Sequence, residues 1–311
     1  MAAAYSLAMN LHTIAQSLEI GQPVTAANLT MFPLLGGREA PPAYTTLDEG
    51  LAAGFVTVTE VSESGRVPEL TIVNDGPTPV LLLDGEELVG AKQNRIVNLT
   101  IMVPPHTRLP LPVSCVEAGR WVHRSRSFAA AGRTHYASGR AKKVEQVSDC
   151  LKESGQRHAD QTAIWNDIDE KAARMSAHSP THAAAAMYEQ SRAKLDEFQR
   201  TLEALPRQVG AVFAVNGAIA GLELFDSPVT WRKSMRKIVE SYGLDALDHQ
   251  EERPLRPRRD PARFLAAVAG SDVEAFPAVG LGEDLRLKAP HIAGAALALD
   301  DQVVHALAFV C

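Results

Sequence analysis

Charged and amide side chains gather at the two ends of an apolar stretch that runs from Asp84 to Trp121. Carboxylates beside cations can act as general acids or bases, because partial burial raises a carboxyl pKa and a neighbouring cation lowers it. Guanidinium groups suit a phosphate, and an indole ring suits a planar base. The candidate catalytic residues are Glu86, Glu87 and Glu117, and the candidate ligand-binding residues are Lys92, Gln93, Asn94, Arg95, Arg120 and Trp121.

A hairpin must hold these residues in place. Every second residue is apolar from 97 to 103 and again from 109 to 115, so each run predicts a strand with one buried face. If residues 104–108 form a five-residue loop, the alternation brings Arg95 opposite Glu117. The register therefore predicts an ion pair between these two side chains.

A second hairpin is expected just upstream. Asp84-Gly85 separates two apolar runs, which is the signal for a two-residue turn. Glu86 and Glu87 are neighbours on a strand and must point to opposite faces, so only one of them can act together with Glu117. Polar residues from both hairpins would then meet at one rim.

Basic charge is concentrated in one segment of an otherwise acidic chain. The formal net charge of the 311 residues is −6, yet residues 92–143 hold ten Lys and Arg residues and a single carboxylate, Glu117. This segment predicts a phosphate-bearing ligand with a planar base. The alternatives are an exposed basic linker without a ligand, and an Arg95–Glu117 pair that only closes a hairpin beside a solvated loop at 92–94. A pI of about 5.9 argues against general nucleic-acid binding.

The composition, 46% hydrophobic and 22% charged, indicates a folded protein. No apolar run is long enough to span a bilayer, and the first residues lack the basic region of a secretory signal. The spacing of Leu7, Leu11, Ile14 and Leu18 predicts an amphipathic helix instead. Three cysteines are too few and too scattered for a disulfide framework or a structural zinc site. We therefore expect a reducing, cytoplasmic setting without a membrane or nucleic-acid partner, and the cofactor is unknown.

The order of strands and helices predicts an α+β fold. Short alternating runs indicate a mainly β domain at 1–137, an antiparallel sandwich that includes a short capped helix at 44–54. Residues 138–311 predict a helical segment followed by a smaller α/β part that is built on two hairpins and packs on the first domain. The elements expected there are helices at 143–152, 157–174 and 181–205, a hairpin turning at Asn216-Gly217, a helix ending at Gly243, a short helix from Asp260 to Gly270, and a final hairpin turning at Asp300-Asp301.

Common catalytic and metal-binding motifs are absent from the sequence. It contains no P-loop, no GxGxxG, no HExxH and no CxxC pair. Cys115 could serve as a nucleophile, but its place on the apolar face predicts a buried, unreactive thiol. His178 and His182 have the spacing of metal ligands on a helix, but Pro180 between them breaks the turn. No metal site is predicted.

Several runs of the sequence resemble one bacterial protein family. They are GEELVGAKQNR within 79–95 and SCVEAGRW within 112–121, with shorter runs at 221–227, 294–297 and 305–309. In these runs the chain is similar to the ADP-ribosylglycohydrolase-and-rhodanese-phosphatase-superfamily-associated protein family. The resemblance implies association with the processing of ADP-ribose and NAD-derived metabolites, and it carries no catalytic assignment. The nine candidate residues named above are the polar positions that match.

Three functions are compatible with these observations. The protein could be an enzyme, such as a hydrolase acting on an ADP-ribose derivative, with cations holding phosphate, Trp121 stacking on the base and Glu86 or Glu117 transferring protons. It could bind such a phosphorylated ligand without turning it over. It could also be a structural partner of ADP-ribose-processing enzymes. Ligand binding without turnover would distinguish the second function from the first.

Overall fold

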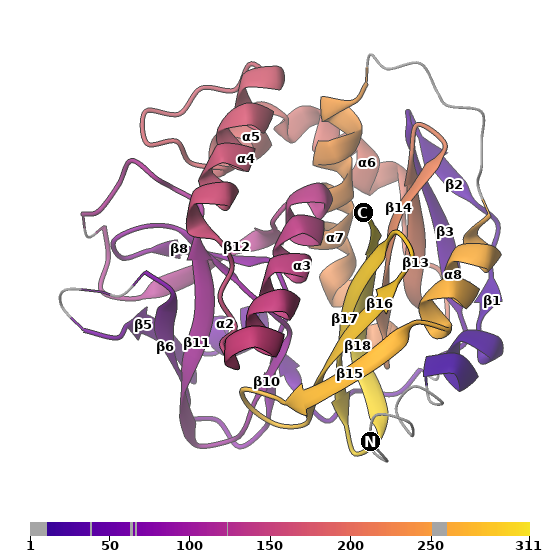
Figure 1. The fold of residues 1–311 in the computed structure, drawn as a ribbon, viewed down its shortest axis with the longest axis horizontal. Coiled ribbons are helices and arrows are strands. Elements are labelled where there is room, and N and C mark those ends of the chain that lie inside the picture. Colours follow the sequence, from indigo (N-terminus) through magenta and orange to yellow (C-terminus); the bar gives the residue numbers. More distant parts are fainter. Residues whose placement is uncertain (1–10, 38, 63–64, 66, 123, 251–259) are drawn as a thin grey trace.

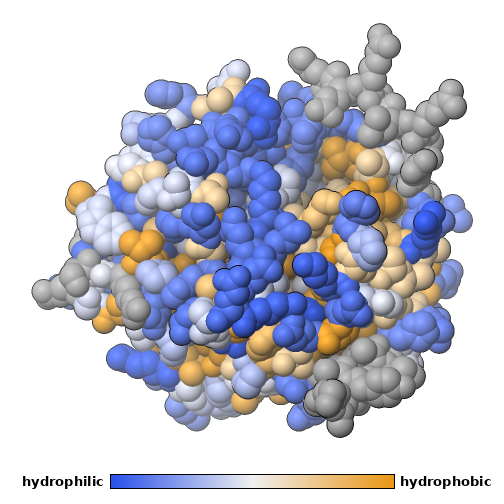
Figure 2. All heavy atoms as spheres, viewed as in Figure 1, coloured by the Kyte–Doolittle hydropathy of each residue, from blue (hydrophilic) through white to orange (hydrophobic). Residues whose placement is uncertain are grey.

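The computed structural model describes residues 11–37, 39–62, 65, 67–122, 124–250 and 260–311. These residues form an α+β fold with two β parts and a group of helices between and around them (Figure 1). The predicted fold class is confirmed. Hydrophilic side chains gather along the middle of the face shown in Figure 2, where the helices lie.

The first β part is a sandwich of two sheets with strand orders β10-β7-β4 and β12-β8-β9-β11-β6-β5. Alternation builds it: in β6 every second residue is buried, and buried apolar side chains such as Val58, Ile72, Ile101 and Val113 form one core. The strands are β4 (Thr45–Thr46), β5 (Val56–Glu60), β6 (Glu69–Asn74), β7 (Val80–Leu82), β8 (Glu86–Gly90), β9 (Arg95–Val97), β10 (Ile101–Val103), β11 (Thr107–Cys115) and β12 (Phe128–Thr134).

The second β part is a nine-stranded antiparallel sheet with the order β1-β3-β13-β14-β18-β17-β16-β15, and β2 pairs with β3 beside it. This sheet takes strands from both sides of residue 137. The division of the chain into two domains at that residue stays a prediction. The strands are β1 (Glu19–Ile20), β2 (Val24–Ala26), β3 (Leu29–Leu35), β13 (Gln208–Val215), β14 (Ala218–Phe225), β15 (Asp272–Pro277), β16 (Glu283–Ala289), β17 (Ile292–Leu299) and β18 (Gln302–Val310).

Helices cover both faces of this large sheet. On one face, α7 (Pro228–Asp248) buries Trp231 and Tyr242 in the same core as Phe213. On the other face, α8 (Pro261–Ala269) packs Phe264 against a core that includes Val212. The remaining helices are α2 (Leu47–Ala52), α3 (Ala137–Ser154), α4 (Gln161–Arg174), α5 (Ala185–Gln190) and α6 (Arg192–Thr201). None of the helices described here is long and apolar enough to cross a membrane.

Local signals correctly predicted several of these elements. Thr46 and Glu49 form a capping box at the start of α2. Asn216 and Gly217 both have positive φ, at 49° and 81°, as the turn between β13 and β14 requires. The turn between β17 and β18 falls at Asp300-Asp301, as expected. Residues 11–17 are helical, whereas Leu7 of the predicted amphipathic helix lies outside the described residues.

Several helix boundaries were predicted wrongly: the helix expected at 143–152 begins six residues earlier, at Ala137, and the one expected at 157–174 begins at Gln161. The helix expected at 181–205 is interrupted at Ser191, which separates α5 from α6. The helix expected to end at Gly243 continues to Asp248. This glycine serves packing, because a Cβ atom there would lie 3.0 Å from the ring of Phe198 on α6. A glycine that allows two helices to approach closely cannot be told from a helix stop by sequence alone.

The predicted register of the site hairpin is also wrong. Strand β11 pairs with β9 so that Val113 faces Val97 and Arg95 faces Cys115, a shift of two residues that separates Arg95 from Glu117. Strand β10 pairs instead with β7 in the other sheet. The chain leaves the sheet of β9 and β11 after β9, so residues 97–103 are not one continuous strand as the loop length assumed. Asn98 lies at this point as a fully buried residue, and its Oδ1 accepts a hydrogen bond from Ser114 Oγ at 2.8 Å.

The two-residue hairpin predicted at Asp84-Gly85 is likewise absent. The turn itself forms, with Gly85 at φ 77° and a hydrogen bond of 3.2 Å from Glu86 N to Leu83 O. Its two strands diverge, because β7 pairs with β10 and β4 whereas β8 pairs with β9 and β12. A hairpin signal therefore marks a change of sheet here, and it brings the Asp84 carboxylate into the interior.

Helix α3 carries two fully buried cations that connect the two β parts. The Arg140 guanidinium donates to Asp84 Oδ1 at 3.1 Å on the sandwich side and to Glu223 Oε1 at 2.6 Å on β14. Lys143 binds the other oxygen of Asp84. The second carboxylate oxygen of Glu223, Oε2, lies 3.0 Å from His305 Nε2. The side chains of these pairs are each at most 2% exposed. A charge buried to this extent is costly unless its partner is present.

Replacing Arg140 with methionine should lower the free energy of unfolding by about 3 to 5 kcal/mol, because it leaves two buried carboxylates without their shared cation. Lys142→Met, two positions along the same helix, is the matched control. Lys142 pairs with Asp167 but is 60% exposed, so its loss should cost less than about 1 kcal/mol. Denaturant unfolding at pH 7 measures both. Similar losses for the two variants would contradict the structural role of Arg140.

Candidate functional site

The three candidate carboxylates are all buried and each has a cation as its partner. Glu86 accepts from Lys237 Nζ on α7 at 2.5 Å. Glu87 points to the opposite side, as predicted, and accepts two hydrogen bonds from Arg133 at 2.6 and 3.1 Å. Glu117 accepts from Arg120 Nε at 2.8 Å. Asn94 connects two of them, because its backbone N donates to Glu117 Oε2 and its Nδ2 donates to Glu87 Oε1, both at 3.2 Å.

Their protonation follows from these surroundings. Burial raises the pKa of Glu86 above its usual value, although Lys237 opposes the shift. Burial alone would also raise the pKa of Glu117, but hydrogen bonds from Arg120, Thr181 and the Asn94 amide outweigh it, and the pKa is lowered. Glu117 is thus an ionised group held in a buried network.

Arg120 occupies the centre of that network. Besides Glu117, its guanidinium donates to Ala91 O at 2.7 Å, to Val122 O at 3.1 Å and to Asn94 Oδ1 at 3.0 Å. The side chain is 6% exposed. Because its donors already have protein acceptors, Arg120 holds neighbouring loops together in this structure.

Arg95 is different, since its side chain is fully buried and only partly satisfied. One nitrogen, Nη1, donates to Gln93 Oε1 and to Cys115 Sγ, both at 2.6 Å. Among the described residues the other two, Nε and Nη2, have no hydrogen-bond partner. The nearest carboxylate oxygen, Oε1 of Glu60, lies 3.9 Å from Nη2, too far for a hydrogen bond. A buried donor without a partner is costly and calls for an explanation.

Trp121 lies directly over this guanidinium. The Arg95 Cζ atom is 5.4 Å from the indole centroid, and Lys92 Nζ is 5.3 Å from it, so both cations contact the ring. Trp121 is nevertheless 43% exposed. The other carboxylate oxygen of Glu60, Oε2, is buried and has no hydrogen-bond partner within the described ranges. We call Glu60, Lys92, Arg95 and Trp121 the Arg95 cluster.

The structure therefore divides the predicted site. Lys92 and Arg95 both contact Trp121, and Gln93 accepts a hydrogen bond from the Arg95 guanidinium. Asn94 instead accepts a hydrogen bond from Arg120. No ion pair links Arg95 to Glu117 among the described residues, because the observed register places Arg95 opposite Cys115. The alternative of a solvated loop is wrong, since residues 92–94 are all at most 8% exposed.

Sequence reasoning missed several buried polar residues. Glu60 is the last residue of β5, and Asp84 lies in the turn before β8. Glu223 and His305 lie in apolar strands, at positions that face the interior. A charged residue on the buried face of a strand is itself a signal, because it must be paired. The groups of His, Cys, Asp and Glu that the structure describes include none with three or more members placed to hold a metal ion.

Cys115 is buried, as predicted, with 0% exposure. Burial raises the pKa of its thiol to about 11, although the nearby Arg95 opposes the shift. Only about one thiol in a thousand would be ionised at pH 8 with such a pKa, and the thiolate is the reactive form.

A thiol reagent at pH 8 should therefore modify the partly exposed Cys150 at least about a hundredfold faster than Cys115 in the native protein. Mass spectrometry of digested samples taken over time measures both rates. In denaturant the two cysteines should react alike, and Cys150→Ser should remove the fast phase. Native labelling of Cys115 at the rate of Cys150 would show that the thiol is accessible.

The comparisons with known proteins agree with the resemblance noted in the sequence. The pattern of the ARG and Rhodanese-Phosphatase-superfamily-associated Protein domain matches residues 17–309, almost the whole chain. The chain belongs to this family. Its description links the domain to ADP-ribosylglycohydrolase and rhodanese-phosphatase proteins. No curated protein and no solved structure matches the chain, so the family description and the Arg95 cluster are the starting points for function.

Proposed function

We propose that this protein binds an ADP-ribose-like phosphorylated nucleotide at the Arg95 cluster and acts there as a binding module that accompanies ADP-ribose-processing enzymes. The single observation that carries the proposal is the buried Arg95 guanidinium, with two donors, Nε and Nη2, that have no hydrogen-bond partner in the part of the chain that the structure describes. These two donors form one edge of the planar fork, which matches two oxygens of a phosphate.

The other members of the cluster fit the rest of such a ligand. The exposed indole of Trp121 offers a face on which adenine stacks. The Oε2 atom of Glu60, which also has no partner, accepts a hydrogen bond from a ribose hydroxyl. Lys92 adds positive charge beside the ring. A phosphate, a base and a ribose therefore each have a complementary group within one cluster.

Binding requires a movement of Trp121. The indole covers Arg95, whose side chain is 0% exposed, so the ring must swing aside before a phosphate can reach the guanidinium. The cation–π contacts that hold the ring are each worth only about 0.5 to 2 kcal/mol. A charge-assisted hydrogen bond to phosphate contributes a comparable or larger amount, and the displaced ring remains close enough to stack on the base.

Binding is favoured over hydrolysis because the candidate acids and bases are already engaged. Glu86, Glu87 and Glu117 each have a cationic partner and are at most 3% exposed. A general base needs to reach the proton that it removes. The hydrolase hypothesis would need these pairs to break, whereas binding at Arg95 leaves them intact. The three free cysteines support a reducing, cytoplasmic setting for this function.

Titration calorimetry with ADP-ribose tests the proposal. Wild-type protein should bind, and Arg95→Lys should bind about ten- to a hundredfold more weakly, because lysine keeps the charge but loses the fork. Trp121→Ala should lose about tenfold through stacking. Arg108→Lys, an exposed position on β11, is the matched control and should bind like wild type.

Two outcomes would overturn this function. One is the absence of measurable binding by a folded wild-type protein. The other is equal affinity in wild type and Arg95→Lys, with thermal unfolding showing that both are folded. Release of free ADP or ribose during the titration, detected by chromatography, would instead favour the hydrolase hypothesis.

A further inference from the structure

A second candidate site is a cavity where residues 14–18 pack against the large sheet. Its volume is about 280 Å³, near the lower end of the range of small-molecule sites. Gly36 and Gly37, which follow β3, and residues of β13, β14 and the turn before β18 form the rest of its walls. No residue of the Arg95 cluster lines it.

The walls of this cavity are largely apolar, and their charge has one sign. Val209, Leu224 and Val303 line the cavity and belong to one core. The charged residues of the lining are Asp226 and Asp301, and none of the described lining residues is Lys, Arg or His. The cavity therefore offers negative charge beside apolar surface.

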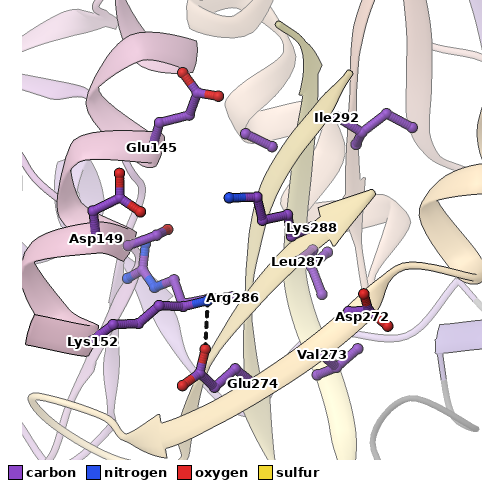
Figure 3. Close-up of a pocket in the computed structure, with 12 residues that line it drawn as sticks. Glu145, Asp149, Lys152, Asp272, Val273, Glu274, Arg286, Leu287, Lys288 and Ile292 are labelled. Carbon is purple, nitrogen blue, oxygen red and sulfur yellow. Dashed lines mark ion pairs between the residues drawn. The ribbon is translucent and has the colours of Figure 1, made fainter. Parts of the chain in front are cut away.

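The larger cavity between α3 and β16 is different, because charges of both signs line it (Figure 3). Lys152 pairs there with Glu274 at 2.6 Å, and the Arg286 guanidinium pairs with Asp284. That cavity indicates no single charge for a ligand, whereas the cavity at Asp226 does.

Asp226 is a carboxylate without a cationic partner. Partial loss of water raises the pKa of this carboxyl group to about 6, although a hydrogen bond from Tyr44 opposes the shift, and no Lys or Arg of the described residues contributes to it. The group is mostly ionised at pH 7. Asp226 is an exposed residue, so a ligand can reach it. By contrast, Glu86, Glu87 and Glu117 each lie beside a cation.

Tyr44 holds this carboxylate in place. Its buried hydroxyl donates to Asp226 Oδ1 at 2.5 Å and lies 2.8 Å from Thr230 Oγ1 on α7. The second carboxylate oxygen, Oδ2, makes no hydrogen bond to another side chain within the described ranges. A fixed carboxylate with an unused oxygen is suited to an ammonium group, which forms a charge-assisted hydrogen bond with it.

We propose that this cavity binds a small alkylammonium ligand, with its ammonium group on Asp226 and its alkyl chain against Val209, Leu224 and Val303. The ligand would supply the positive charge that the described residues do not place beside this carboxylate. Its alkyl chain would leave water for the apolar walls. A metal ion fits less well, because it needs several oxygen ligands, and no group of three or more His, Cys, Asp and Glu residues in the described part of the chain is placed to hold one.

Saturation-transfer NMR with pentylamine as the probe tests this site, because the method detects weak binding. At pH 8 the amine is protonated and Asp226 is ionised. Wild type should bind pentylamine about tenfold or more tightly than 1-pentanol, which has the same chain without a charge. The affinity should rise about fourfold for each methylene added from propylamine to pentylamine, since the added group is buried.

Three variants locate the amine. Asp226→Asn keeps an oxygen for the Tyr44 hydroxyl but removes the charge, so it should weaken pentylamine about tenfold and leave 1-pentanol unchanged. Asp149→Asn, in the cavity of Figure 3, is the matched control and should bind like wild type. Ser17→Trp, at an exposed position of the lining, should fill the cavity and weaken both probes.

The proposal is overturned if wild type does not bind pentylamine, if 1-pentanol binds as tightly, or if a folded Asp226→Asn variant keeps the wild-type affinity. Weakening by Asp149→Asn would place the amine in the other cavity and would overturn it as well. Binding of ADP-ribose should be unchanged in Asp226→Asn, because this residue lies outside the Arg95 cluster. The two proposed sites can therefore fail separately.

Discussion

Two carboxylates that share one buried guanidinium hold this fold together. Asp84 comes from the sandwich, Glu223 from the large sheet, and Arg140 from the helix between them. A buried charge is expensive unless it is paired, and its partner must then stay in place. The interaction therefore fixes α3 relative to both β parts at once.

The same rule separates structural from functional charges in the candidate site. Glu86, Glu87, Glu117 and Arg120 are all buried, and each is fully engaged with partners of opposite charge or with backbone oxygens. Arg95 departs from the rule, because two of its donors are buried without acceptors. The unused donors of Arg95 say more about a ligand site than its charge does. A residue type that suits phosphate is common in this segment, but a guanidinium with unused donors beneath an exposed indole is not.

Local chemistry predicted the local structure well. The turn at Asn216-Gly217 and the capping box of α2 depend on neighbours in sequence, and both are present. The register of the site hairpin depended on an assumption about loop length, and it failed because β9 and β10 belong to different sheets. Alternation continues through the crossing from one sheet to the other and does not reveal it.

The sequence indicated which segment holds the candidate site, but it did not show which of its side chains contact one another. The types of Lys92, Arg95 and Trp121 point to the segment that holds most of the Arg95 cluster, because charge and aromatic content are visible in a single sequence. Which of the neighbouring charges are already paired depends on residues far along the chain, such as Lys237 for Glu86, 151 positions away. Glu60 was missed for the same reason, since it lies on β5 and reaches Arg95 of β9 although β6 and β11 stand between these two strands in the strand order.

A double-mutant cycle on Asp84 and Arg140 tests the central claim most directly. The free energy of unfolding would be measured at pH 7 for wild type, Asp84→Asn, Arg140→Met and the double variant. If the buried pair couples the sandwich to α3 and the large sheet, the two substitutions should be strongly non-additive, with a coupling energy of about 1.5 kcal/mol or more. Effects that add to within about 0.5 kcal/mol would show that the two side chains do not depend on each other.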